Sequence, residues 1–170
     1  MEVWTEGVTI SPPTYTAPQP QAQGDEACSW STVVFRYAND ITVEFKNRRH
    51  NDAGALFVGD KGKIEIFRNR ITSNPPELVK EPIKDDDIHL YRSDDHMRNW
   101  LDCIKSRKPC VADVEIGHRS ATVCHLGNIA RWTNRKLRWD PASETFPDDA
   151  DANKLLDRHR RKPYELPETV

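Results

Sequence analysis

The sequence has no hydrophobic run long enough to cross a membrane and no strong excess of charge of either sign. A membrane-spanning helix needs about 18 or more apolar residues in a row, and only 36% of all residues here are hydrophobic. The N-terminal segment MEVWTEGVTI lacks the basic start and the apolar stretch of an export signal. Its 25 basic and 27 acidic residues give a net charge of −2 and no global attraction for nucleic acid. We therefore expect a soluble, cytoplasmic chain that binds neither membranes nor nucleic acid.

Cysteine and glycine are sparse, and neither falls into a functional pattern. The four cysteines, Cys28, Cys103, Cys110 and Cys124, include no CxxC pair, which argues against a zinc ribbon and favours free thiols. The seven glycines include no GxGxxG, so they predict no phosphate cradle for a dinucleotide. GxSxG and HExxH motifs are also absent. We therefore assign the chain no catalytic residue and no cofactor-binding residue.

Proline content and strand patterns divide the chain into three parts. Residues 1–27 hold four of the twelve prolines and are expected to form an irregular N-terminal arm. Residues 28–140 carry the patterns of one α+β domain, because a chain of this length suits a single core. Residues 141–170 predict a loop, a short helix around 153–158 and a tail.

Two hairpins are predicted in the first half of that domain. The turn of the first hairpin falls at Asn39 and Asp40, since both residue types tolerate positive φ. The second, ALFVGDKGKIEIF, turns at its two glycines, Gly59 and Gly62. Residues 74–91 follow neither the strand period nor the helix period and are expected to form a surface loop. The sheet should therefore be mainly antiparallel.

Two helices are predicted in the second half. The first begins at the N-cap Ser93 and stops before Pro109. The second runs from about Asp113 to Trp132 with apolar residues at helical spacing, and residues 136–140 form a short returning strand. This order predicts an α+β fold in which helices pack on one face of an open, mainly antiparallel sheet.

Three polar side chains on the second predicted helix are candidate site residues. His118 and His125 are seven residues apart, so a helix places both imidazoles on roughly one face. Metal-binding helices usually pair histidines at i and i+4 with a carboxylate nearby, and we therefore assign no metal ligand. Arg119 could hold an anionic or hydroxyl-rich ligand, or could pair with Glu115 one turn earlier, which is the simpler interpretation.

Gly127 lies within the same predicted helix. Glycine there costs about 1 kcal/mol relative to alanine. We therefore expect a close approach of the helix backbone to a neighbouring element at Gly127.

Residues 96–130, HMRNWLDCIKSRKPCVADVEIGHRSATVCHLGNIA, carry a family resemblance. They resemble the C-terminal domain of bacterial Gfo/Idh/MocA oxidoreductases, in the branch common in planctomycetes. The likeness continues through RKLRWDP, and backward through GALFVGDKGKIEI and EVWTEGVTISPPTY. It covers nearly the whole chain.

The resemblance implies a fold and indicates which domain binds the cofactor and which binds the substrate. Members of the family have an N-terminal Rossmann domain that holds NAD(P), followed by a domain whose open antiparallel sheet binds substrate on one side and a partner subunit on the other. The family's glycine fingerprint, its Glu-Lys-Pro motif and its helix with Asp and His are upstream of the part that this chain resembles. The KEP at residues 80–82 is not that motif.

By this resemblance, the chain is the substrate-side and oligomerisation portion of an NAD(P)-dependent oxidoreductase of sugars or cyclitols. It is expected to lack catalytic activity of its own, to bind no cofactor and to form a homo-oligomer through its sheet face. His118, Arg119 and His125 fall in the GHRS and CHLGN motifs, which implies that they line the substrate cleft or the subunit interface. The alternative is a stand-alone carbohydrate-binding or scaffold module. A parent enzyme could carry an export signal.

Overall fold

The computed structural model describes residues 1–7, 32–46, 54–67, 69–157 and 160–165. The chain divides into two compact units, one made of Met1–Asn47 and Val114–Val170 and the other of Arg48–Asp113. We call these the first and the second unit. Each contains one antiparallel sheet. The structure thus divides the stretch 28–140, for which the sequence predicted a single domain.

The sheet of the first unit has the strand order β3-β2-β1-β7. Its strands are β1 (Glu2–Glu6), β2 (Thr32–Arg36), β3 (Thr42–Phe45) and β7 (Leu137–Arg138). Val3 of β1 is in register with Phe35 of β2 on one side and with Leu137 of β7 on the other. Since side chains directly opposite each other share a face, these three residues form a single apolar surface.

The strand β1 corrects the expectation of an irregular arm over residues 1–27. Glu2–Glu6 pairs with both β2 and β7 and so lies inside the sheet. Five residues are too few for a clear alternating pattern, and the prolines that follow suggested extended, unpaired chain. Residues 8–31, including Cys28, lie outside the described part of the chain, so the rest of the expected arm stays a prediction.

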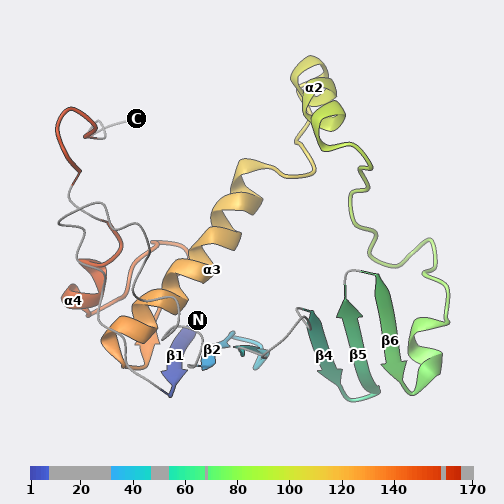
Figure 1. Cartoon of the computed structure of the whole chain (residues 1–170), viewed down its shortest axis with the longest axis horizontal. Helices are drawn as coiled ribbons and strands as arrows, with labels where there is room; N and C mark the ends of the chain where they lie inside the picture. The colour runs from blue at the N-terminus through green and yellow to red at the C-terminus, as the bar shows by residue number, and fades with distance from the viewer. Residues whose placement is uncertain (8–31, 47–53, 68, 158–159, 166–170) are drawn as a thin grey trace. The chain divides into compact units, whose positions relative to one another are not determined.

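The helix α3 (Val114–Thr133) packs against the apolar face of this sheet (Figure 1). Leu126, Ile129 and Ala130 are spaced i, i+3 and i+4, so they project from one side of the helix, and each is at most 2% exposed. The buried core comprises Val3, Val33, Phe35, Leu126, Ile129, Ala130, Leu137, Trp139, Phe146 and Ala152. The predicted helix from about Asp113 to Trp132 and the predicted returning strand are both confirmed.

The chain after β7 returns to the core and ends in the short helix α4 (Ala150–Asn153). Asn153 holds the preceding loop in place: its Oδ1 accepts from the Phe146 backbone N–H at 2.8 Å, and its Nδ2 donates to the Phe146 carbonyl at 2.9 Å. The helix expected around residues 153–158 is not found in the described part of that range: the structure has a four-residue helix at Ala150–Asn153 instead, capped by the Asp149 carboxylate.

The sheet of the second unit has the order β4-β5-β6 and is antiparallel (Figure 1). Its strands are β4 (Ala55–Gly59), β5 (Gly62–Phe67) and β6 (Arg70–Asn74). The predicted turn between Gly59 and Gly62 is confirmed, and Gly62 requires the absence of a side chain: its φ is +140°, and a Cβ there would lie 2.2 Å from the Asn74 carbonyl oxygen. The sequence analysis assigned no strand to β6.

After a short 3-10 helix, η1 (Pro76–Val79), the chain is irregular up to α2 (His96–Ser106). Asp95, rather than the predicted Ser93, caps α2: its Oδ1 accepts from the Arg98 backbone N–H at 2.8 Å. The helix ends at Arg107, which adopts the left-handed conformation two residues before Pro109. The predicted stop before Pro109 is therefore confirmed.

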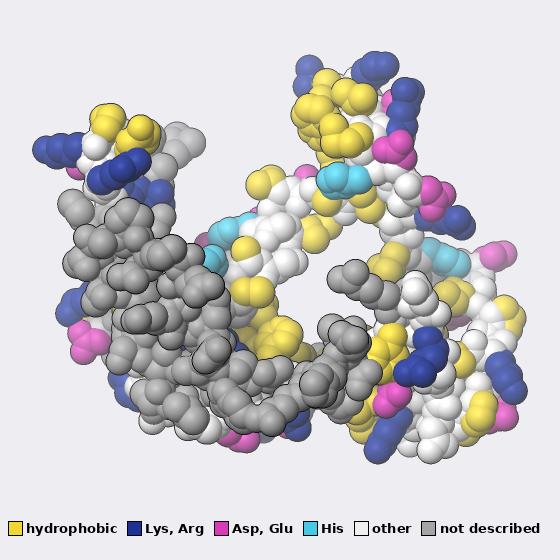
Figure 2. Space-filling view, viewed as in Figure 1, with side chains coloured by type: hydrophobic (Ala, Val, Ile, Leu, Met, Phe, Trp, Pro, Cys, Tyr) yellow, Lys and Arg dark blue, Asp and Glu magenta, His cyan; other side chains and the backbone are white. Residues whose placement is uncertain are grey.

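One face of α2 is apolar and exposed. Met97, Trp100, Leu101 and Ile104 recur at helical spacing and are 43–60% exposed. Figure 2 shows hydrophobic side chains gathered on this helix. None of the helices in the described ranges has the length and the apolar character needed to cross a bilayer. The predicted α+β class with antiparallel strands and a helix-covered face is confirmed, with the strands divided between two sheets.

Candidate functional site

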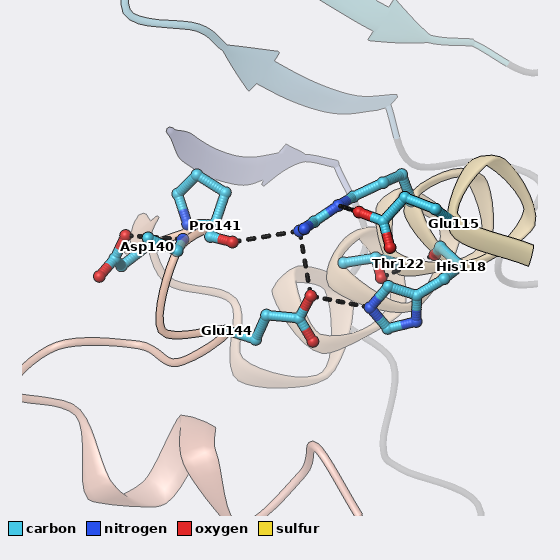
Figure 3. Close-up of polar contacts among 8 residues, drawn as sticks. Glu115, His118, Thr122, Asp140, Pro141 and Glu144 are labelled. Atoms are coloured by element: carbon cyan, nitrogen blue, oxygen red, sulfur yellow. Dashed lines mark hydrogen bonds and ion pairs between the residues drawn. The ribbon is translucent and has the colours of Figure 1, made fainter.

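Two of the candidate residues, His118 and Arg119, meet at one carboxylate (Figure 3). Glu144, in the loop after β7, lies 2.8 Å from the Nε2 of His118 and 3.0 Å from the Nη1 of Arg119, both through its Oε1. A carboxylate only accepts hydrogen bonds, so the Nε2 of His118 carries the shared proton. Residues from α3 and from the C-terminal loop thus form one polar cluster within the first unit.

The predicted ion pair between Arg119 and Glu115 is also present. The Nε of Arg119 donates to the Glu115 carboxylate at 2.7 Å, one helical turn away. Its Nη1 donates to the Pro141 carbonyl at 3.1 Å as well as to Glu144. The guanidinium is therefore committed to protein acceptors on both sides, which favours a positioning role for Arg119 over direct capture of an anion.

The loop that carries Glu144 is built around Asp140. One oxygen of the Asp140 carboxylate accepts from the Ala142 backbone N–H at 3.0 Å, and the other accepts from the Ser143 hydroxyl at 2.7 Å. Glu144 itself has a φ of +51°, a left-handed conformation that is uncommon for a residue with a side chain. These contacts fix the turn and direct the Glu144 side chain to α3.

The surroundings of Glu144 favour its charged form. The hydrogen bond from His118 holds the pKa of the Glu144 carboxyl below its usual value. The positive charges of His118 and Arg119 lower this pKa further, while partial desolvation opposes them. The carboxylate is therefore ionised at neutral pH and keeps the His118 ring oriented.

His118 and His125 line the same cavity, as their spacing predicted. The cavity has a volume of about 340 Å³. Its polar lining consists of His118, Thr122, His125 and Glu144, and its other walls are Ala121, Leu126, Ile129, Trp132, Trp139, Leu155 and Leu156. Arg119 is not among the lining residues and lies behind Glu144. Among the described residues, no hydrogen bond to the His125 ring is present.

This cavity combines hydrogen-bonding groups with aromatic and aliphatic walls. An imidazole and a hydroxyl can each donate or accept, which suits the hydroxyl groups of a polar ligand. Indole and leucine side chains suit the C–H faces of the same ligand. The described residues include no group of three or more His, Cys, Asp or Glu side chains arranged for a metal ion.

Glu144, Trp132 and Trp139 were not among the site residues that the sequence predicted. Glu144 is 26 residues from His118 and lies in a loop without regular pattern, so only the tertiary structure brings the two together. Trp132 lies in α3 and Trp139 directly follows β7, and the two line one cavity in the folded chain. The single signal in the sequence was the run Asp140 to Ser143, whose side chains are typical of a turn.

The chain matches a known protein family along most of its length. Residues 9–166 match the family described as "Oxidoreductase family, C-terminal alpha/beta domain", the C-terminal domain of Gfo/Idh/MocA proteins. No curated protein and no solved structure gives a match. The family match agrees with the architecture of antiparallel strands and helices. This chain therefore belongs to the Gfo/Idh/MocA oxidoreductase family, within its C-terminal alpha/beta domain.

Proposed function

We propose that this chain forms the substrate-side part of an NAD(P)-dependent oxidoreductase that acts on sugars or cyclitols. The observation that carries the proposal is the family match over residues 9–166, which covers the C-terminal alpha/beta domain. The cavity beside α3 supports it, because its volume of about 340 Å³ falls within the range typical of small-ligand pockets, roughly 300–1,000 Å³.

The proposed ligand contacts come from the polar side of the cavity. His125 and Thr122 hydrogen-bond ligand hydroxyls, and Trp132 covers an apolar face of the ring. His118 is held by Glu144 and presents its Nδ1 as an acceptor when the ring is neutral. Arg119 and Glu115 support Glu144 and His118 without touching the ligand.

The residues that the structure describes do not fit a dinucleotide. A dinucleotide fold places a glycine-rich turn between a parallel strand and the helix that receives the phosphates. Here both sheets are antiparallel, and residues 107–113, which lead into α3, contain no glycine. We therefore derive no hydride-transfer step for this chain, and the proposed cofactor site belongs to other residues of the enzyme.

A binding assay tests the proposed cavity. We expect a panel of sugars and cyclitols, titrated calorimetrically, to contain a ligand whose affinity falls at least tenfold in His125→Ala. Cys124→Ala is the matched control, because Cys124 is the exposed neighbour of His125 and does not line the cavity. NADH fluorescence should show no saturable binding. Saturable NADH binding at micromolar concentrations of the chain would contradict the proposal. An equal loss of sugar binding in His125→Ala and Cys124→Ala would also contradict it.

We also propose that the chain assembles with copies of itself through the sheet of the second unit. Phe57, Ile66 and Ile71 lie on one face by register and are 38–59% exposed. Analytical ultracentrifugation should show a dimer or larger assembly that dissociates in Phe57→Glu. Thr72→Glu, on the opposite face, should leave the assembly intact. A wild-type monomer would refute this assembly.

The stand-alone carbohydrate module remains the second candidate, because the cavity lies wholly within the first unit. The mass of the native gene product, detected with an antibody to this chain, separates the two. A product much heavier than 19.6 kDa supports the oxidoreductase. A product near that mass, with sugar binding retained, supports the module.

A further inference from the structure

The end of α2 brings two thiols to the same place in the second unit. Cys103 lies in the last turn of the helix and is 7% exposed. Cys110 lies four residues beyond the helix end and is partly buried. Both are free thiols, and no part of the proposed function uses them.

The backbone after α2 folds back along the helix and carries Cys110 toward Cys103. Arg107, with a φ of +58°, reverses the chain direction. On one side of Cys110, the Cys103 thiol donates to the Pro109 carbonyl at 3.4 Å. On the other side, the Val111 backbone N–H donates to the Asn99 side chain at 2.9 Å. Asn99 and Cys103 are four residues apart on one helix face, so the two contacts hold Cys110 against that face.

The two sulfur atoms therefore lie within reach of each other. Partial desolvation raises the pKa of the Cys110 thiol, and the neighbouring Cys103 and Asp113 act in the same direction. The hydroxyl of Tyr91 contacts the Cys103 sulfur at 3.9 Å. A disulfide requires Cα atoms within about 7 Å, which a helix end folded back on itself can satisfy.

We propose that Cys103 and Cys110 are a redox modification site and form a reversible intrachain disulfide when the protein meets hydrogen peroxide. Cys110 reacts first because it is the more accessible of the two. Its thiolate attacks the peroxide O–O bond, takes one oxygen as sulfenic acid, and the other oxygen leaves as water after protonation. Cys103 then attacks that sulfur, the S–S bond forms, and a second water leaves. Two thiols are oxidised and one peroxide is reduced.

The disulfide ties the C-terminal turn of α2 to the segment that leads into α3. It replaces the weak hydrogen bond from Cys103 to the Pro109 carbonyl with a covalent link across residues 104–109. Because the raised pKa of Cys110 keeps the thiolate scarce at neutral pH, we expect the rate to rise roughly tenfold each time the pH is raised by one unit, as long as the pH stays below that pKa.

Peptide mapping of the whole chain after treatment with hydrogen peroxide tests the proposal. Trypsin cleaves after Arg98, Lys105 and Arg107 but not between Lys108 and Pro109, so the two cysteines fall in peptides 99–105 and 108–119. We expect these peptides to appear joined without reductant, with the chain lighter by two hydrogen atoms, and to separate when a thiol reductant is added.

Variants distinguish this pair from chance oxidation. Cys124→Ser should keep the joined peptides, because Cys124 is exposed and belongs to another helix. Cys110→Ser should lose them while keeping its circular dichroism spectrum. The proposal is overturned if peroxide converts Cys110 to sulfinic acid while Cys103 stays reduced. It is also overturned if Cys110 joins Cys124 or a second chain instead.

Discussion

Gly127 is a buried residue at which α3 packs directly against its sheet. A Cβ at this position would lie 3.4 Å from the Cζ of Phe35 and 3.5 Å from a methyl group of Val33. Both distances are those of ordinary contact, so the expected close packing is confirmed and leaves room for one methyl group.

Gly127→Ala should therefore be neutral or stabilising by up to about 1 kcal/mol, because alanine favours the helix and its methyl group fits. Gly127→Leu should destabilise by roughly 1–3 kcal/mol through overpacking. Gly117→Ala is the matched control, since no atom lies within 4 Å of its added Cβ and only helix propensity changes. Chemical denaturation measures all three. A clear loss of stability in Gly127→Ala would show that the contact with Phe35 is tighter than described.

Glu144 makes the stability of the first unit depend on pH. Its pKa is lowered in the folded chain, chiefly by the hydrogen bond from His118. A lowered folded pKa contributes stability that is present above the unfolded value, about 4.3 for glutamate, and is lost as the pH falls through the folded pKa. At neutral pH, Glu144→Gln should melt at a lower temperature than the wild type. The difference between the two melting temperatures should shrink as the pH is lowered from 7 to 3.

The His118→Asn background provides the control for this measurement. Without the imidazole, Arg119 alone remains to hold the carboxylate, so Glu144→Gln should change the melting temperature less. If Glu144→Gln lowers the melting temperature equally with and without His118, then His118 is not the main cause of the lowered pKa of Glu144.

At the scale of residues, the sequence predicted contacts along one helix and missed contacts across the fold. The pairing of Arg119 with Glu115 and the shared helix face of His118 and His125 follow from helical geometry alone. The position of Glu144 depends on a loop conformation with positive φ, for which the sequence contains no glycine signal.

Among the elements, α2 offers a direct comparison of two candidate caps. The sequence predicted Ser93, whereas the Asp95 carboxylate accepts the hydrogen bond from Arg98. An N-cap side chain contributes about 1 kcal/mol. Asp95→Ala should therefore weaken α2 by about that amount, read as faster hydrogen exchange between His96 and Ser106, while Ser93→Ala should change it little. A larger effect on hydrogen exchange from Ser93→Ala than from Asp95→Ala would show that Ser93 is the cap.

The hairpins were predictable because their turns have a local cause. Asp40 adopts a φ of +60° and Gly62 one of +140°, as turn residues with freedom at positive φ do. The strand β1 was not predicted, because its partners β2 and β7 lie far along the chain. The strand β6 was missed although it pairs with the adjacent β5, because its sequence RITSN is mostly polar and shows no apolar alternation. Tertiary pairing, rather than strand propensity, forms β1.

For the whole molecule, the division into two units predicts that damage to one core stays local. Phe35 is fully buried in the first unit, and Phe35→Ala should cost about 3–5 kcal/mol. Hydrogen exchange should quicken in β1, β2 and α3 but not in β5, which belongs to the second unit. Ile41→Ala, at a position 54% exposed, is the mild control. Equal loss of protection in β5 would show a single cooperative unit.

The fold class followed from the sequence, while the division into units did not. Turn-separated strands followed by helices already predict an antiparallel α+β fold, since each pattern is local. The boundary of the units depends on which segments contact each other, and the first unit joins residues from both ends of the chain. Periodicity contains no information on such long-range contacts.

The burial of α3 changes along its length, and this limits how the protein can evolve. Residues 114–121 are exposed, with Val114 at 84% and Ile116 at 56%, whereas Leu126, Gly127, Ile129 and Ala130 are buried. Mutations in the second half alter core packing, so selection should retain small and apolar residues there. The first half can accept new side chains at little cost in stability, Glu115, His118 and Arg119 apart. One helix can thus preserve the fold with one half and diversify recognition with the other.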